Sequence, residues 1–326
     1  MRTITFSQAT LEAMQEEMRR DPTVFVYGED IVRQGGIFGQ FKGLPEEFGD
    51  RIRDVPISET MIVGAALGAA LTGTRPVADM HFADFIGVAF DEVANQIAKN
   101  RYMFGGQANI PLVIRAPDGI SKQAAAQHSQ SVEGWLQNIP GLIIVSPSSP
   151  ATAKGLLKSS IRQNDPVIFF EHKMLYPQKG PVPEEEYLTP IGKAEVRRPG
   201  KDVTIVTYSI MVQKCEEVAA ELEKEGISVE IIDLLTLKPF DEETVLNSVR
   251  KTHRCVVAHE AVVNGGLGAE IAARVQEKAF YYLDAPVLRV GAKNVPVPFS
   301  AVLENFVAAN QGDIKRAVKK VLYREE

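Results

Sequence analysis

The stretch PISETMIVGAALGAALTGTRPVADM, residues 56–80, has one acidic residue at the start of a run of small and apolar residues. Ser58 is a residue type that favours helix N-caps. The pattern predicts a helix over residues 59–72, followed by a strand over residues 77–80. Glu59 then lies in the first helical turn, where the helix dipole favours an acid whether or not it takes part in chemistry.

Apolar runs and helical patterns alternate on both sides of this stretch. Alternation of this kind indicates βαβ units and a mainly parallel sheet covered by helices on both faces. Further strands are predicted at 24–27, 111–115, 142–145 and 167–171, and further helices at 7–20 and 84–103.

A polar stretch with several prolines, residues 177–190, is typical of an interdomain linker. The alternation restarts beyond Gly200. Strands are predicted at 203–207, 229–232, 255–258 and 287–290, with helices at 211–224, from 242 and after 268. We therefore expect two doubly wound α/β domains, residues 1–185 with the linker at the end, and residues 186–326.

Composition narrows the class of protein. The 326 residues carry a formal net charge of −6 and no basic block, which argues against nucleic-acid binding. No apolar run approaches the roughly 20 residues of a membrane span, and the N-terminal residues resemble neither a signal nor a transit peptide. Cys215 and Cys255 have no neighbouring cysteine, so we expect buried thiols and a cytoplasmic location.

Two glycine-rich stretches, 34–39 and 265–268, lack the spacing of a dinucleotide or P-loop motif, so we favour tight turns there. The five histidines show no i, i+4 pair, which argues against a zinc-hydrolase site. His128 lies in a loop of small and polar residues after a predicted strand, where α/β folds place chemistry, although an ordinary exposed histidine fits equally. Phe85 follows a predicted strand, and both a core role and contact with a flat ligand are open.

A set of motifs in order resembles the beta subunit of the decarboxylating component of thiamine-diphosphate-dependent 2-oxo acid dehydrogenase complexes, a family that includes pyruvate, branched-chain 2-oxo acid and acetoin dehydrogenases. The resemblance spans essentially the whole chain. The motifs are GED at 28–30, PISE at 56–59, GTRPV at 73–77, FADF at 82–85, AKNRYM at 98–103, QHSQ at 127–130, DPV at 165–167, EHK at 171–173 and GGLGAE at 265–270.

The resemblance implies a pyrimidine-binding, transketolase-like first domain and a transketolase C-terminal-like second domain. Thiamine enzymes hold the diphosphate through magnesium bound at a Gly-Asp-Gly motif, which this sequence lacks. In the family, that half of the site belongs to an alpha subunit. The resemblance thus implies an α2β2 heterotetramer that takes a small 2-oxo acid or acetoin and acylates a lipoyl acyltransferase component.

The resemblance also implies roles for single residues. Glu59 matches the acid that hydrogen-bonds the aminopyrimidine ring, Phe85 the aromatic residue packed on that ring, and Ile57 the aliphatic residue beside it. His128 matches a histidine that handles protons during acyl transfer to the lipoyl arm. His81 departs from the family pattern, and we expect it beside the cofactor, where it tunes substrate choice.

Two further positions follow from the resemblance. Glu92 is a departure, since an Asp-Gln pair is more usual than Asp91-Glu92. A structural potassium ion, held mostly by backbone carbonyls, is common in such subunits. The matching positions are Leu112, Ser160, Ile161, Gln163 and Asp165.

Two alternatives remain beside this interpretation. A self-sufficient transketolase-type enzyme is disfavoured by the missing diphosphate motif. A non-catalytic scaffold subunit is disfavoured because Glu59, Phe85 and His128 are all retained. Residues 171–176 and 82–85 resemble acetoin and branched-chain types more than mammalian pyruvate enzymes, but the sequence does not choose a substrate.

Overall fold

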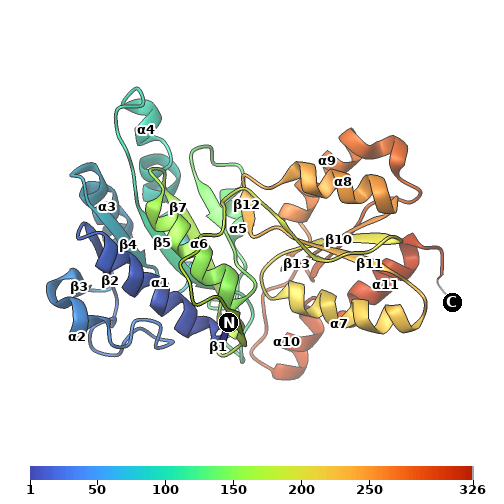
Figure 1. Cartoon of the computed structure of the whole chain (residues 1–326), viewed down its shortest axis with the longest axis horizontal. Coiled ribbons are helices and arrows are strands. Elements are labelled where there is room, and N and C mark those ends of the chain that lie inside the picture. The colour runs from blue at the N-terminus through green and yellow to red at the C-terminus, as the bar shows by residue number, and fades with distance from the viewer. Residues whose placement is uncertain (325–326) are drawn as a thin grey trace. The chain divides into compact units, whose positions relative to one another are not determined.

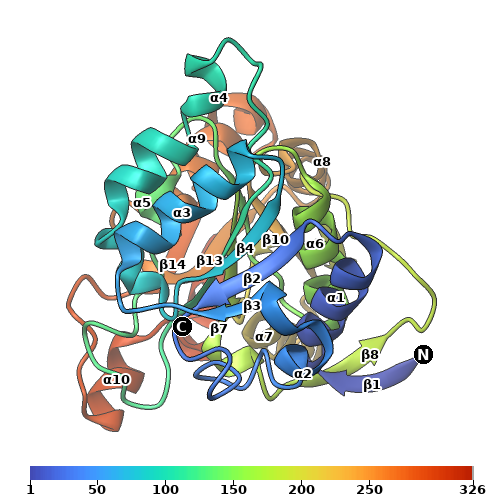
Figure 2. The same ribbon diagram turned by 90° about the vertical axis from the view of Figure 1, so that its left-hand side faces the viewer.

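A parallel sheet built from the first half of the chain forms the centre of the first of two units (Figures 1 and 2). The computed structural model describes residues 1–324. Residues 1–118 and 135–191 form the first unit, and residues 119–134 together with those from 192 onward form the second.

The strands of the first unit lie in the order β6-β7-β5-β4-β2-β3, and all of these neighbours pair in parallel. Their carboxyl ends therefore share one edge of the sheet, where α/β folds place ligands. The strands are β2 (Val24–Gly28), β3 (Ile52–Asp54), β4 (Arg75–Asp79), β5 (Val113–Asp118), β6 (Ile143–Val145) and β7 (Val167–His172).

Helices cover both faces of this sheet. Figure 2 shows α1 (Phe6–Arg20) and α6 (Pro150–Arg162) on one face and α3 (Glu59–Leu71) on the other. The remaining elements of this unit are short: β1 (Arg2–Thr5), which pairs antiparallel with β8 (Lys179–Val182), α2 (Leu44–Phe48), η1 (Gly49–Arg51), α4 (Asn100–Met103), α5 (Glu133–Leu136), which begins in the second unit, and η4 (Lys173–Leu175).

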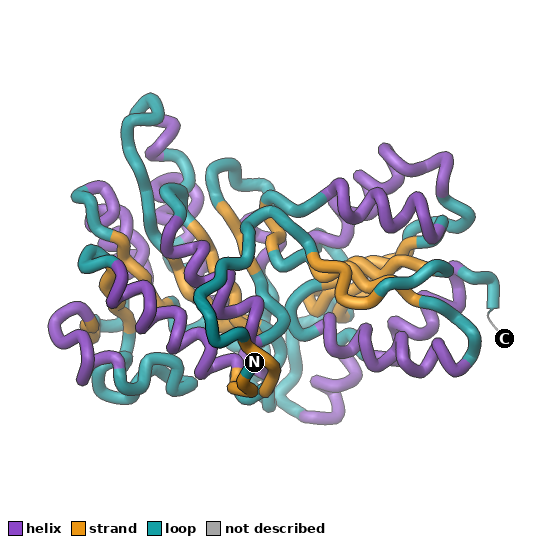
Figure 3. The backbone as a smooth tube through the Cα atoms, viewed as in Figure 1, coloured by secondary structure: helices purple, strands orange, loops and turns teal. Residues whose placement is uncertain are grey.

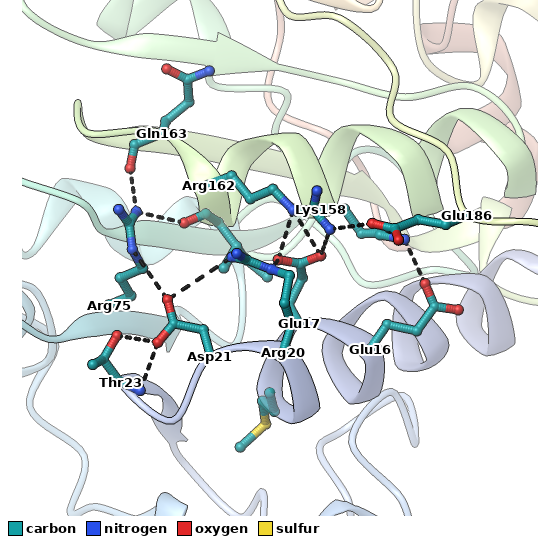
Figure 4. A network of polar contacts seen from close by, with 12 residues as sticks. Glu16, Glu17, Arg20, Asp21, Thr23, Arg75, Lys158, Arg162, Gln163 and Glu186 are labelled. Atoms are coloured by element: carbon teal, nitrogen blue, oxygen red, sulfur yellow. Dashed lines mark hydrogen bonds and ion pairs between the residues drawn. The ribbon is translucent and has the colours of Figure 1, made fainter.

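Charged side chains as well as apolar ones join α1 to α6. Lys158 is 1% exposed, and its Nζ lies 2.6 Å from Oε2 of Glu16 (Figure 4). Arg162 pairs with Glu17, which is fully buried. Burial of these charges is tolerated because each has an opposite partner within hydrogen-bond distance. Both helices begin with a capping box, at Thr5 and at Ser149.

The predicted single helix over residues 84–103 forms as separate pieces. A 3₁₀ helix, η2 (Ala83–Gly87), is followed by a π-helix, η3 (Glu92–Ile97), and then by α4. π-Helical turns are rare and occur frequently at functional sites. Gly64 of α3 lies against this segment, since a Cβ there would lie 3.8 Å from Cγ of Glu92.

The second unit holds a sheet in the order β14-β13-β10-β11-β9, in which only the β11–β9 pair is antiparallel. Figure 1 shows α8 and α9 on one face and α7 and α11 on the other, and Figure 3 shows the same layers by element type. The elements are β9 (Glu195–Arg198), β10 (Val203–Thr207), α7 (Met211–Lys224), β11 (Val229–Asp233), β12 (Thr236–Lys238), α8 (Glu242–Thr252), β13 (Cys255–Val262), α9 (Leu267–Ala279), η5 (Phe280–Tyr282), β14 (Leu288–Ala292), α10 (Ala301–Val307) and α11 (Gln311–Val321).

The predicted α/β class with two mainly parallel sheets is confirmed. Within residues 1–324, no helix combines the length and apolar character needed to span a membrane. Cys215 and Cys255 are both buried free thiols, and burial raises the pKa of each to about 12.

Candidate functional site

Glu59 is the first residue of α3, as predicted, and is half-buried. Ser58 has the backbone conformation of an N-cap, but its side chain makes no capping hydrogen bond. Across residues 1–324, no hydrogen bond or ion pair engages the Glu59 carboxylate. The helix start therefore presents an acid whose oxygens are available to a ligand.

A second acid, Glu29, lies near Glu59 and follows directly after β2. Its side chain is buried, and its Oε1 has no hydrogen-bond donor among the described residues. Burial raises the pKa of the Glu29 carboxyl, and the neighbouring charge of Glu59 raises it further. Glu29 thus holds its proton more firmly than an exposed glutamate does.

Aromatic rings gather at the carboxyl end of β4. The ring centroids of Phe82 and Phe85 lie 5.6 Å apart in an edge-to-face arrangement, and Phe38 contacts Phe82 with centroids 5.9 Å apart. The ring centroids of His81 and Phe82 lie 5.3 Å apart. The backbone of His81 has a positive φ of 64°. Phe85 is half-buried, so part of its ring faces away from the protein core.

A buried carboxyl group, that of Asp79, fixes the backbone of the turn that follows β4. Asp79, the last residue of β4, is 1% exposed, and its Oδ2 accepts a hydrogen bond from the backbone N–H of His81 at 3.3 Å. Burial raises the pKa of Asp79 to about 7, and the nearby charge of Arg115 opposes that shift. Arg115 itself is held by Glu171 through two hydrogen bonds of 2.5 and 2.8 Å.

Ile57 precedes the helix and is 78% exposed. Covering this side chain with a ligand or a second chain would bury apolar surface. The first unit therefore brings His81, Phe82 and Phe85 together at one strand end, and Glu59 beside Glu29.

His128 belongs to the second unit, in the loop of residues 119–134. Its side chain is half-buried. Lys122, Gln123 and Ala125, shortly before it, all have positive φ angles, of 42°, 64° and 59°. Backbone of this kind is uncommon outside glycine and marks a loop whose shape is imposed by its surroundings.

The five positions expected to hold potassium already have partners within the protein. Nη1 of Arg75 donates to the backbone oxygens of Ile161 and Gln163, at 2.9 and 2.7 Å (Figure 4). The carbonyl oxygens of Ser160 and Leu112 accept backbone hydrogen bonds, from Gln163 and Val167. The Asp165 carboxylate pairs with Arg101.

A guanidinium group therefore occupies the place of a monovalent cation at the end of α6. A potassium ion at these oxygens would be repelled by the charge of Arg75, which already bonds two of them. These residues do not fit the ion in this structure. Within residues 1–324, no group of three or more His, Cys, Asp or Glu side chains is arranged to hold a metal ion.

Sequence reasoning assigned no role to Glu29 or Asp79, although Gly28-Glu29-Asp30 formed part of the motif set. The signal available was an acid directly after an apolar strand, which α/β folds place at the ligand edge. The contacts of Asp79 with Arg115 and of Arg75 with the end of α6 join residues far apart in the chain. No local pattern reveals such contacts.

Comparison with known proteins gives consistent matches over the chain. Residues 2–179 match the pyrimidine-binding domain of transketolase, and residues 192–314 match the transketolase C-terminal domain. A solved chain of a split-gene transketolase, described as an inactive beta4 tetramer, superimposes with a TM-score of 0.82 at 26% identity and covers 99% of both chains.

Curated relatives are more similar in sequence. The beta subunit of acetoin:2,6-dichlorophenolindophenol oxidoreductase from Cupriavidus necator is 48% identical, over 98% of each chain. The beta subunit of the pyruvate dehydrogenase E1 component from Rhizobium meliloti is 45% identical, over 99% of this chain and 71% of the relative.

Proposed function

Since the chain belongs to the family of beta subunits of 2-oxo acid and acetoin dehydrogenases, we propose that it supplies the pyrimidine-binding half of a thiamine-diphosphate site. Its oxidoreductase activity would require an alpha subunit, in an α2β2 heterotetramer, that holds magnesium and the diphosphate. Thiamine diphosphate supplies, when bound, the carbanion chemistry that decarboxylation or acetoin cleavage requires. The acyl group would pass to the lipoyl domain of an acyltransferase component.

The observation that carries this proposal is the available carboxylate of Glu59 beside a buried second acid. The residues around it fit an aminopyrimidine. Glu59 has no protein partner among the described residues and can hydrogen-bond a ring nitrogen, and Phe85 offers part of an aromatic face. Ile57 is 78% exposed, and contact with the apolar edge of the cofactor would bury its side chain, which is favourable.

The chain's own groups would then divide the work. Glu59 would share a proton with the pyrimidine ring. Glu29 lies near it, and burial together with the charge of Glu59 raises the pKa of Glu29. His81 would lie beside the cofactor and tune substrate choice. His128 would handle protons during acyl transfer.

Three further points remain part of the proposal. We place the domain boundary between residues 185 and 186. We also propose that the protein is located in the cytoplasm, where free buried thiols such as Cys215 and Cys255 are ordinary. Potassium is left out of the proposal, because Arg75 already bonds the backbone oxygens of Ile161 and Gln163. The substrate would be pyruvate, a branched-chain 2-oxo acid or acetoin, the substrates that the names of the relatives point to.

Dye reduction by the assembled enzyme tests the proposal. The chain is co-purified with its alpha subunit and assayed on the three substrate types, as the unmutated protein and as Glu59→Gln. Because glutamine cannot share a proton with the ring, we expect turnover to fall about 100-fold or more with assembly intact.

Glu46→Gln is the matched control, because Glu46 is also an acid in a first helical turn but is exposed on α2. Its turnover should stay at the unmutated level. Near-normal turnover by Glu59→Gln would remove Glu59 from the mechanism. Turnover by the chain alone, with cofactor and magnesium, would favour the self-sufficient transketolase type instead.

A further inference from the structure

The loop that carries His128 is held by acids of the second unit. Residues 119–134 pack with this unit rather than with the strand that precedes them. Positive φ angles at Lys122, Gln123 and Ala125 cost conformational free energy, and they persist only where surrounding contacts impose them. The contacts that impose them are therefore part of what places His128.

Two buried carboxylates supply those contacts. Oε1 of Glu260, on β13, accepts a hydrogen bond from the backbone N–H of Ile120 at 2.6 Å. Oε2 of Glu304, on α10, accepts one from the backbone N–H of Gln123 at 2.9 Å. Glu260 and Glu304 are 7% and 8% exposed, so both hydrogen bonds are shielded from water. Removing a buried acceptor leaves its backbone donor unpaired, which is unfavourable.

Figure 2 shows the green loop beside the red α10, in agreement with the second of these bonds. Each acceptor bonds the loop backbone and not a loop side chain, so the contacts set the path of the chain whatever side chains it carries. Gln123, bound by Glu304, is one of the strained residues. The two acids thus hold the part of the loop that leads directly to His128.

The far end of the loop is fixed by a third acid. Glu133 is 1% exposed and accepts a hydrogen bond from the hydroxyl of Tyr208 on the second unit. Gly134 lies against the 265–266 turn, since a Cβ there would lie 3.0 Å from the carbonyl oxygen of Gly265. The loop is therefore held at Ile120 and Gln123 near its start and at Glu133 at its end.

We propose that Glu260 and Glu304 are positioning residues that hold this loop in its strained conformation and thereby place His128 for acyl transfer. The proposal rests on the role of His128 in the proposed function. Neither acid needs to contact substrate or cofactor. Their removal should slow the step that uses His128 and leave the steps that depend on Glu59.

Amide hydrogen exchange tests the positioning without reference to any reaction. Glu260→Ala and Glu304→Ala in the assembled enzyme should raise exchange of the backbone amides in residues 119–130 by roughly tenfold or more, because each variant removes the acceptor of a buried backbone hydrogen bond. Exchange elsewhere in the second unit should stay unchanged. Glu277→Ala, an exposed acid on α9, is the control. Unchanged protection of residues 119–130 would overturn the proposal.

Two activities then separate positioning from a merely structural role. In Glu260→Ala and Glu304→Ala, transfer to the lipoyl domain should fall roughly tenfold while dye-coupled turnover and its KM change less than about twofold. Glu260→Gln and Glu304→Gln should recover part of the transfer rate, because the amide oxygen still accepts a hydrogen bond. Equal loss of both activities would mark the acids as structural and overturn the proposal.

The same experiments keep the two proposals apart. If the unmutated assembly turned over none of the three substrate types, the proposed function would fail. Amide exchange would still report whether Glu260 and Glu304 hold the loop. If the assembly is active and exchange is unaffected by the variants, the positioning proposal alone fails.

Discussion

Asp79 is buried at the end of β4, where its carboxyl oxygen fixes the backbone of His81 and so the corner that leads to Phe85. Burial raises the pKa of Asp79 to about 7 against an ordinary value of 3.8. Because the Asp79 carboxyl keeps its proton near neutral pH, its contribution to stability depends on pH.

The pH dependence has a defined sign. Between about pH 4 and pH 7 the folded protein retains a proton on Asp79 that the unfolded chain releases, so its contribution to stability falls as pH rises and is level above pH 7. Asp79→Asn mimics the protonated form. Relative to the unmutated protein, the variant should gain roughly 2 kcal/mol of unfolding free energy between pH 5 and pH 8.

Urea unfolding at both pH values measures this difference. Asp50→Asn, an exposed acid in η1, is the control and should show no relative gain. Parallel stability curves for Asp79→Asn and the unmutated protein would show that Asp79 is ionised throughout this range, which would contradict the account of the corner.

Single residues differ in how far the sequence predicts them. Glu59 was placed correctly at the start of a helix, because its small-residue pattern is local. The surroundings of His128 were not predictable, since acids more than a hundred residues later in the chain hold its loop. Local sequence patterns predict the element on which a residue lies. They do not predict which residues far away in the sequence contact it or hold it in position.

At the scale of elements, most long strands and helices of both sheets were predicted within a few residues. The departures have physical causes. The 84–103 segment forms 3₁₀, π and α turns in succession, and its π-helix packs against α3. Helix α6 was not predicted at all, although Ser149-Pro150 is a helix-start signal. The short antiparallel pair of β1 and β8 joins the two ends of the first unit, and no turn signal marks it.

A substitution at Arg75 tests whether its guanidinium group takes the place of a potassium ion at the end of α6. Arg75→Met removes the donors to the carbonyl oxygens of Ile161 and Gln163. We expect the Tm of the variant to fall and then to rise in potassium chloride relative to sodium chloride at equal ionic strength, because the freed carbonyls can take a monovalent ion.

The unmutated protein should show the same Tm in both salts. Arg33→Met, which removes a largely exposed guanidinium group, is the control for loss of charge. A specific rise in Tm with potassium in the unmutated protein would show that Arg75 does not replace the ion. The five positions would then be a potassium site, as the resemblance implies.

At the scale of the whole molecule, the proposed function gives the chain one half of a catalytic site. Two observations agree with this proposal. The sequence lacks a Gly-Asp-Gly motif, and the Glu59 carboxylate is available to a ligand in the structure. The family was recognisable because motifs recur in order over the whole chain, and the sequence matches confirm it. The substrate was not recognisable from the sequence, because the relatives are named for different substrates, acetoin and pyruvate.

The most direct test of the central claim is the rate at which the C2 proton of thiamine diphosphate exchanges for deuterium, measured by NMR after acid quench. The account predicts rapid exchange only in the assembly with the alpha subunit, slowed about 100-fold or more by Glu59→Gln with cofactor still bound. Equal exchange in the Glu59→Gln assembly, or rapid exchange with this chain alone, would contradict it.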